Sequence, residues 1–113
     1  MTRGEVWLVT FDPTLGAEIQ KTRPAVIVSR DTLGILPLRV VVPLTGWLPE
    51  FAARPWMVHV GPTVENGLTK ESAADAFQVK SVSALRLRQR LGVVTPPVLE
   101  QIVRTVGAVI EHP

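Results

Sequence analysis

Short runs of apolar and β-branched residues, each closed by turn-forming residues, limit this chain to a mainly β fold. Runs of roughly four to eight such residues are typical of strands and are short for a helix. The runs at residues 24–29 and 38–44 are the most continuously apolar, which favours strands buried on both faces of a sheet. We expect strands at residues 5–11, 24–29, 38–44, 56–60, 72–79 and 88–94, with the weakest pattern at 72–79, and a short helical turn at residues 81–85.

The end of the chain has the period of a helix instead. Thr95 is placed to cap the first turn, and Pro96 and Pro97 fit that turn because its N–H groups have no partner within the helix. Apolar residues then recur on one helical face, at Val98, Leu99, Ile102, Val103, Val106, Val109 and Ile110. Several short strands and one amphipathic helix predict a small, strongly bent sheet or half-open barrel with the helix packed across it.

Length and composition are those of a single folded domain. A chain of 113 residues leaves no room for a second core, so we expect one domain over residues 1–113. Its 46% hydrophobic and 19% charged residues favour a folded core over disorder. The absence of cysteine excludes disulfides and thiolate chemistry, and no stretch approaches the roughly 20 apolar residues of a membrane helix. Because the N-terminus lacks a signal-peptide pattern, we expect a cytoplasmic protein that does not associate with membranes.

The residues available for chemistry favour phosphate binding over metal or cofactor chemistry. Only two histidines occur, His59 in an expected strand and His112 next to the C-terminus, and there is no glycine-rich nucleotide motif. We therefore expect neither a metal nor a cofactor. Arginines bind phosphate through paired hydrogen bonds and aromatic residues stack on unpaired bases, a combination that suits single-stranded RNA. The alternative for Trp7, Trp47 and Trp56 is a place in the core or in a dimer interface.

Arg23 stands out because it immediately precedes a strand expected in the core. In the stretch E-I-Q-K-T-R-P-A-V-I-V-S-R, Pro24 restricts Arg23 to an extended backbone, so the guanidinium leaves a rigid strand in a defined direction. A surface ion pair worth under about 1 kcal/mol is the simpler explanation of such an arginine. Thr45, at the exit of the strand at 38–44, would lie beside Arg23 if the two strands end at the same edge of the sheet.

Several fragments, in this order, resemble the MazF/PemK family of toxin endoribonucleases, the toxins of bacterial toxin–antitoxin pairs. The fragments are R-G-E-V-W-L-V-T-F-D-P, G-A-E-I-Q-K-T-R-P-A-V-I-V-S, V-V-P-L-T, Q-V-K-S and the closing helix, and together they span nearly the whole chain. The resemblance implies a small Src-homology-3-like β-barrel of the CcdB/Kid toxin type with a C-terminal helix. It also implies a homodimer that cleaves single-stranded RNA such as mRNA without a metal, and a cognate antitoxin whose acidic, disordered tail fills the RNA groove.

The resemblance further implies which residues form the site. The family motif G-x-E-x-x-x-x-R-P places the catalytic arginine at Arg23 and an assisting glutamate at Glu18, and V-P-x-T places a catalytic threonine at Thr45. In that family the RNA 2′-hydroxyl attacks the adjacent phosphate, which gives a 2′,3′-cyclic phosphate and a 5′-hydroxyl end. We expect Arg23 to stabilise the developing charge, because a guanidinium is a poor general base. The expected RNA-binding residues are Lys21, Thr22, Trp47, Gln78 and Lys80.

The chain departs from the family pattern immediately before Gln78. Many members carry an acid there, in some relatives with a catalytic part, whereas this chain has Phe77. Asp75 lies two residues earlier and is expected on the same strand face, but it cannot be assumed to replace that acid. Two other functions stay open: a toxin of the same fold that poisons DNA gyrase by protein contact, and a non-catalytic RNA- or peptide-binding barrel.

Overall fold

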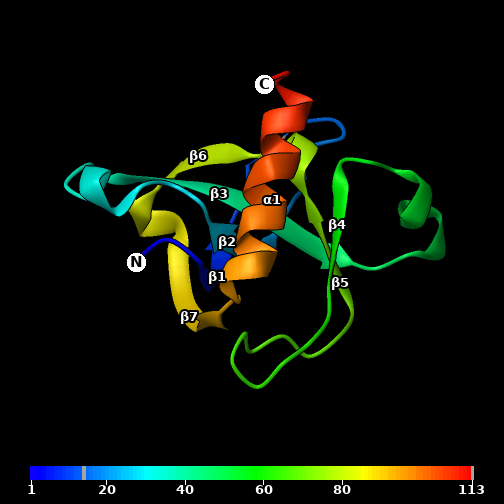
Figure 1. Cartoon of the computed structure of the whole chain (residues 1–113). Coiled ribbons are helices and arrows are strands. Elements are labelled where there is room, and N and C mark those ends of the chain that lie inside the picture. Colours follow the sequence, from blue (N-terminus) through cyan, green and yellow to red (C-terminus); the bar gives the residue numbers. More distant parts are fainter. Residues whose placement is uncertain (14, 113) are drawn as a thin grey trace.

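The described residues form seven strands and one C-terminal helix, which confirms the predicted mainly β fold (Figure 1). The computed structural model describes residues 1–13 and 15–112. The strands are β1 (Glu5–Thr10), β2 (Thr22–Ile27), β3 (Leu38–Gly46), β4 (Met57–Val60), β5 (Ser72–Asp75), β6 (Lys80–Ser83) and β7 (Leu87–Val93), and the helix is α1 (Pro96–Val109). Short 3₁₀ turns lie at Asp31–Leu33, Pro49–Ala53, Ala76–Gln78 and Ala84–Arg86. Each of the six expected strands overlaps a strand of the structure, whereas β6 has no counterpart among them.

The strands pair antiparallel in the order β4-β5-β3-β2-β1-β7, and β6 pairs with β3 beside β5. Over the described residues, no pairing joins β4 to β7, so the sheet is strongly bent but not closed. The expected barrel therefore fits only loosely, and the half-open form is the better description. Chain order explains much of this arrangement, since β1 to β3 are consecutive neighbours.

A 3₁₀ turn interrupts the strand expected at residues 72–79. β5 and β6 both lie along β3, with Ala74 opposite Leu44 and Lys80 opposite Val41, and the turn Ala76–Gln78 bulges between them. The prediction that Asp75 and Phe77 share a strand face is wrong, because strand alternation ends at Asp75. Asp75 is 8% exposed whereas Phe77 is 68% exposed.

The helical turn expected at residues 81–85 lies later, at Ala84–Arg86, since residues 80–83 form β6. The C-terminal helix begins where the prolines predict, but the predicted capping bond is absent: within the described structure Thr95 occupies the capping position and its side chain accepts no hydrogen bond from the first turn. Ile102 is the fully buried residue of α1, and Val98, Leu99, Val103, Val106 and Val109 are partly buried. Ile110, expected on the same face, follows the helix and is 65% exposed. No helix in residues 1–13 and 15–112 is long and apolar enough to cross a membrane.

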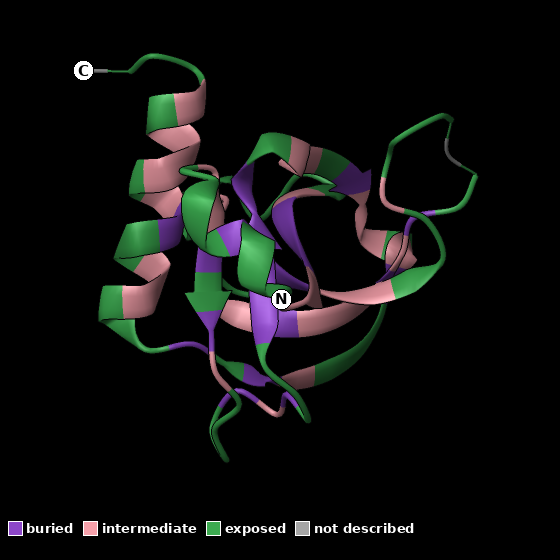
Figure 2. Ribbon diagram, turned by 90° about the vertical axis from the view of Figure 1, so that its right-hand side faces the viewer, coloured by how far each residue is buried: buried purple, intermediate pink, exposed green. Residues whose placement is uncertain are grey.

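Two clusters of buried side chains lie on opposite faces of the central strands. The helix-side cluster packs under α1 and consists of Val6, Val26, Val42, Leu44, Val58, Val60, Leu68, Ala74, Val94 and Ile102. The loop-side cluster consists of Val9, Phe11, Ala25, Ile27, Val41, Val82 and Leu87. Figure 2 shows α1 on one side of the sheet and the loop between β1 and β2 projecting on the other. Because β2 contributes alternate residues to both clusters, the prediction that it is buried on both faces is confirmed.

Two glycines allow the segment before β5 to lie against β7. A Cβ on Gly92 would come within 2.1 Å of the Glu65 carbonyl oxygen, and one on Gly67 within 2.1 Å of the Leu91 carbonyl oxygen. Gly67 also has a φ of +68°, a backbone conformation that side chains disfavour. The Val93 N–H donates to the Glu65 carbonyl at 2.8 Å, so this close approach also forms a backbone hydrogen bond.

Glu5 ties the N-terminus to the β1–β7 edge of the sheet. Its Oε1 accepts from the Trp7 indole N–H at 3.0 Å and from the Thr2 N–H at 2.9 Å, and its Oε2 accepts from Arg90 Nε at 2.9 Å. The N-terminal amine lies 3.3 Å from Oε1. The carboxylate therefore has partners from both strands and from the terminus.

Candidate active site

The register of β2 and β3, extended past its last pair, sets Arg23 opposite Thr45. Arg23 pairs with Val9 of β1, and β2 pairs with β3 through Ala25 and Pro43. Continued by two residues, the same register aligns Arg23 with Thr45. Alternation places both side chains on the face that carries Ala25, and both residues are partly exposed. A joint site needs this arrangement, since neither strand alone holds both groups.

The loop between β1 and β2 folds over that face. Ile19 packs against the loop-side cluster. The neck of the loop is closed where the Phe11 N–H donates to the Lys21 carbonyl at 2.8 Å and the Lys21 N–H donates to Asp12 Oδ1 at 2.9 Å. Lys21 has a φ of 67°, an uncommon conformation for a non-glycine residue that is enriched at functional sites. Lys21 is exposed, as an RNA-binding role requires, but its RNA binding stays a prediction.

Arg23 is held by the loop that precedes it. Its Nε donates to the Gln20 carbonyl at 3.0 Å. Among the described residues this is the one hydrogen bond of the guanidinium, so both terminal NH₂ groups can reach a phosphate. No carboxylate pairs with Arg23 within residues 1–13 and 15–112, so the simple surface ion pair considered above is not what the structure shows.

Gln78 and Lys80, two of the expected RNA-binding residues, both contact the loop around Glu18. Lys80 Nζ lies 3.5 Å from Glu18 Oε2, and Glu18 Oε1 accepts from the Leu15 N–H at 3.2 Å. Gln78 donates from Nε2 to the Ala17 carbonyl at 3.1 Å, and its Oε1 accepts from the Ile19 N–H at 3.2 Å. The structure therefore brings Gln78 and Lys80 to the loop that carries Glu18, whereas their contact with RNA stays a prediction.

Thr22, the remaining expected RNA-binding residue of this region, lies at the first position of β2. Its hydroxyl lies 3.2 Å from the Thr10 hydroxyl across the strand pair. Arg88 Nε donates to the same Thr10 hydroxyl at 3.1 Å, and Arg86 donates to the Thr10 carbonyl at 3.0 Å. These contacts fix the base of the loop and give it a basic border.

An aromatic cluster begins two residues after Thr45. The Trp47 ring packs at a tilt of 59° against the His59 ring, with centroids 4.6 Å apart, and meets the Phe51 ring edge-on at 5.8 Å. Arg54 lies over the Phe51 ring at 5.1 Å. His59 is an exposed strand residue, as expected, and its pairing with Trp47 has no local signal in the sequence. Partly exposed aromatic rings of this kind can stack on unpaired bases.

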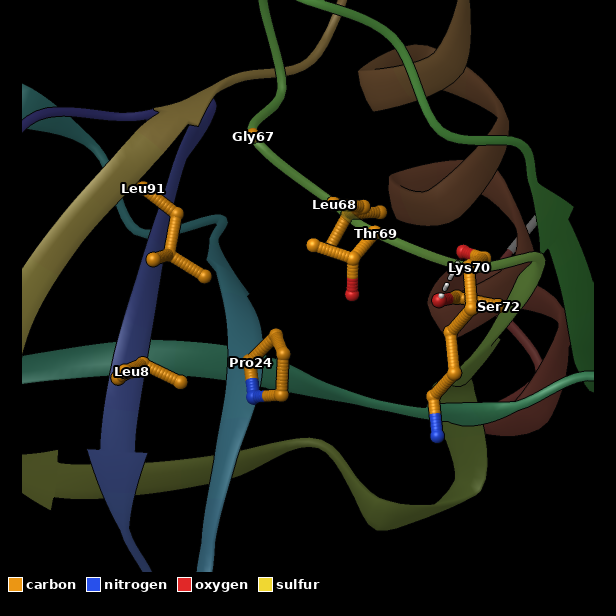
Figure 3. A pocket seen from close by; sticks show the side chains of 8 residues that line it. All are labelled: Leu8, Pro24, Gly67, Leu68, Thr69, Lys70, Ser72 and Leu91. Atoms are coloured by element: carbon orange, nitrogen blue, oxygen red, sulfur yellow. Dashed lines mark hydrogen bonds between the residues drawn. The ribbon is translucent and has the colours of Figure 1, made fainter.

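A pocket of about 220 Å³ lies on the opposite face of β2 from Arg23 (Figure 3). Its lining is mostly apolar and consists of Leu8, Pro24, Gly67, Leu68, Thr69, Lys70, Ser72 and Leu91. Pro24 follows Arg23 in the strand, so their side chains leave opposite faces. Figure 3 shows the Lys70 side chain reaching toward β3, where a Cβ on Gly46 would lie 3.3 Å from its Nζ. This pocket therefore belongs to the helix side of the sheet and not to the face of Arg23 and Thr45.

Asp75 is the buried acid nearest to the turn that carries Gln78. Burial raises the pKa of Asp75 above its ordinary value, against the opposing effect of the N–H groups of Phe77 and Gln78 and of the Arg54 charge. Asp75 Oδ1 accepts from the Phe77 N–H at 3.1 Å, so its contacts support the turn. No group of three His, Asp or Glu in the described part of the chain is arranged to hold a metal ion.

Comparison with known proteins gives consistent matches over almost the full length. The family profile described as PemK-like, MazF-like toxin of type II toxin-antitoxin system matches residues 2–110. The protein of Mycobacterium tuberculosis named Endoribonuclease MazF9 is 34% identical over 108 residues, which cover 90% of this chain and 89% of that protein.

Solved structures show the same arrangement of strands and helix. MazF of Deinococcus radiodurans superposes with a TM-score of 0.81 at 20% identity, over 98% of this chain and 96% of its own. A mycobacterial endoribonuclease in complex with its cognate antitoxin has a TM-score of 0.78 at 23% identity, over 100% of this chain and 97% of its own. At these identities the likeness establishes the shared fold.

Proposed function

Since this chain belongs to the PemK-like, MazF-like toxins of type II toxin–antitoxin systems, we propose that it is a sequence-specific endoribonuclease that cleaves single-stranded RNA without a metal ion. The observation that carries the proposal is the β2–β3 register through Ala25 and Pro43, which aligns Arg23 with Thr45 when it is continued by two residues. Cleavage of mRNA by such an enzyme inhibits translation and growth. The relative named Endoribonuclease MazF9 supports the assignment of the reaction.

In the proposed reaction the RNA 2′-oxygen forms a bond to the adjacent phosphorus, and the bond from phosphorus to the 5′-oxygen breaks. Glu18 takes the proton of the 2′-hydroxyl, and the departing 5′-oxygen takes a proton from water. The hydroxide left by that water takes the proton from Glu18, which restores the carboxylate. The products are a 2′,3′-cyclic phosphate and a 5′-hydroxyl end. A carboxylate within hydrogen-bond reach is a suitable base for this step.

Arg23 and Thr45 stabilise the charge that develops on the phosphate. The two NH₂ groups of Arg23 donate to phosphate oxygens, and the Thr45 hydroxyl donates to one of them. A guanidinium stays protonated in proteins, so Arg23 binds charge and does not act as a base. The Gln20 carbonyl fixes the fork by accepting from Nε.

The bases beside the cleaved bond are read by the loops that border this face. Trp47, two residues after Thr45, and His59 provide rings that pack against each other, and Lys21 provides a cation at the neck of the catalytic loop. We assign the sequence preference of cleavage to these groups.

The partners follow from the family assignment. A mycobacterial endoribonuclease of the same fold is known in complex with its cognate antitoxin, and we propose such a partner here, with an acidic, disordered tail that occupies the RNA face. We also propose that the toxin is a homodimer and that it acts in the cytoplasm, where mRNA is found.

The test is cleavage of single-stranded RNA by the purified protein in excess EDTA, with mapping of the fragment ends. Polynucleotide kinase should phosphorylate the new 5′ ends without prior phosphatase treatment, and the new 3′ ends should carry cyclic phosphate. Arg23→Ala and Thr45→Val should reduce cleavage by at least about a hundredfold, the effect typical of losing a donor to a developing oxyanion. Arg104→Ala, at an exposed arginine of α1, is the matched control and should cleave normally.

Three results would count against the proposal. Loss of cleavage on chelation would indicate a metal enzyme. Substantial cleavage by folded Arg23→Ala protein would remove Arg23 from the mechanism. Absence of cleavage for every RNA tested would favour the gyrase-poisoning toxin or the non-catalytic binding barrel.

A further inference from the structure

We infer that Gln78 is a positioning residue, whose side-chain amide clasps the loop that carries Glu18 and thereby orders the catalytic groups before RNA binds. The inference rests on the proposed function, because the order of this loop matters only if Glu18 and Arg23 act on RNA. It assigns Gln78 a different role from the RNA contact expected from the sequence.

The clasp consists of two hydrogen bonds on either side of Glu18. Gln78 Nε2 donates to the Ala17 carbonyl at 3.1 Å, and Gln78 Oε1 accepts from the Ile19 N–H at 3.2 Å. One primary amide thus pairs with the backbone of two residues that flank Glu18, as a neighbouring strand would. The peptide units before and after Glu18 are fixed together, which restricts the direction of its side chain.

The clasp is anchored in the central sheet. Gln78 ends the 3₁₀ turn that bulges between β5 and β6, and both of these strands pair with β3. Asp75 Oδ1 accepts from the Phe77 N–H, and Ala76 is fully buried, so the turn is held at its start. Thr45 belongs to the same β3. The clasp therefore sets the position of Glu18 relative to Thr45 through a rigid element.

The two hydrogen bonds of Gln78 also act on Arg23, through Gln20. Gln20 follows Ile19, and its carbonyl accepts from Arg23 Nε at 3.0 Å. Lys80 adds an ion pair to Glu18 at 3.5 Å, but an exposed pair of this kind contributes little by itself. Gln78 thus connects to the sheet the loop that carries Glu18 and that holds Arg23 through Gln20.

Gln78→Ala is the variant that tests this role, with Gln89→Ala, at an exposed residue of β7, as the matched control. The first readout needs no RNA: the hydrogen-exchange protection of the Ile19 amide, measured by NMR. Loss of its acceptor should lower this protection by about tenfold, the size expected for one or two hydrogen bonds. The second readout is RNA cleavage, in which kcat should fall by about tenfold or more while KM changes little.

Two further variants separate positioning from general damage. In a Glu18→Ala background, adding Gln78→Ala should lower kcat much less than it does in the wild type, because both changes remove the same contribution. Gln78→Glu keeps the size of the side chain and an acceptor for Ile19, but sets a carboxylate oxygen against the Ala17 carbonyl. It should retain part of the Ile19 protection, and it replaces Gln78→Ala if the alanine variant fails to fold.

The outcomes distinguish this inference from the proposed function. If the wild type cleaves RNA and Gln78→Ala raises KM without changing kcat or the Ile19 protection, Gln78 contacts RNA and the inference is wrong. Equal cleavage by wild type and variant, with the protection lost, would also overturn it. If the wild type cleaves no RNA, the proposed function fails, and the inference fails with it.

Discussion

Glu5 offers a stability test whose direction and size follow from its contacts. Partial burial by itself would raise the pKa of this carboxyl, but hydrogen bonds from Trp7, Thr2 and Arg90, together with the N-terminal amine, lower it from 4.5 to about 2. The folded protein therefore holds Glu5 ionised at a pH where the unfolded chain protonates it. The stabilisation is fully present above about pH 4.5 and is lost as the pH falls toward about 2.

The magnitude follows from the size of this change in pKa. A difference of one in pKa corresponds to about 1.4 kcal/mol, so the fall from 4.5 to about 2 is worth about 3 kcal/mol. The Glu5 side chain is only 15% exposed, so solvent screens these contacts weakly. Glu5→Gln keeps one oxygen that can accept from Trp7 and Thr2, but it lacks the charge and sets an amide NH₂ against the Arg90 donor. It should lower the free energy of unfolding at pH 7 by about 2 to 3 kcal/mol.

The assay is guanidinium denaturation of wild type and Glu5→Gln between pH 7 and pH 2. The two curves of unfolding free energy against pH should be separated at pH 7 and converge near pH 2. Glu100→Gln, at an exposed helix residue paired with Arg104, should cost under about 1 kcal/mol and serves as the control. A constant separation between wild type and Glu5→Gln across this range would refute the reasoning, because it would arise from packing and not from the charge.

Three other substitutions test the site and the fold. Arg23→Lys keeps the charge but loses the paired donors and the bond to Gln20, so kcat/KM for RNA cleavage should fall by at least about tenfold, and wild-type activity would contradict the assigned fork. Gly92→Ala should lower the denaturation free energy by about 3 kcal/mol or more, because its Cβ would meet the Glu65 carbonyl at 2.1 Å, and an unchanged midpoint would contradict this packing. Gly107→Ala should raise that free energy by up to about 1 kcal/mol, since the nearest atom to its Cβ lies at 3.8 Å and glycine disfavours a helix interior, whereas destabilisation would indicate a hidden clash.

Local patterns were sufficient to predict most of the secondary structure. The run at 24–29 and the helical face after Thr95 are visible in the sequence because burial on a sheet or helix selects apolar residues at a fixed period. The restricted backbone of Arg23 was also predictable, because Pro24 acts only on the residue directly before it and on itself. The register of β2 and β3 pairs Ala25 with Pro43, and continuing it by two residues aligns Arg23 with Thr45, an arrangement that the sequence left conditional.

Local patterns did not predict the 3₁₀ turn at Ala76–Gln78. A-D-A-F-Q-V alternates well enough for a strand, and the bulge appears only because β5 and β6 both pair with β3 at offset registers. The same bulge buries Asp75 and exposes Phe77, which reversed the expectation that they share a face.

The sequence by itself therefore determined the mainly β class and the C-terminal helix, because each depends on short-range periodicity, and its resemblance to the MazF/PemK family supplied the residues proposed for RNA cleavage. Tertiary structure alone decided that the sheet stays open, that Trp47 packs against His59, and that Gln78 bonds to the backbone on either side of Glu18. These two hydrogen bonds of Gln78 connect residues that are separated by 59 and by 61 positions in the chain. No local pattern records such contacts, because they form only after the central sheet has brought the two segments together.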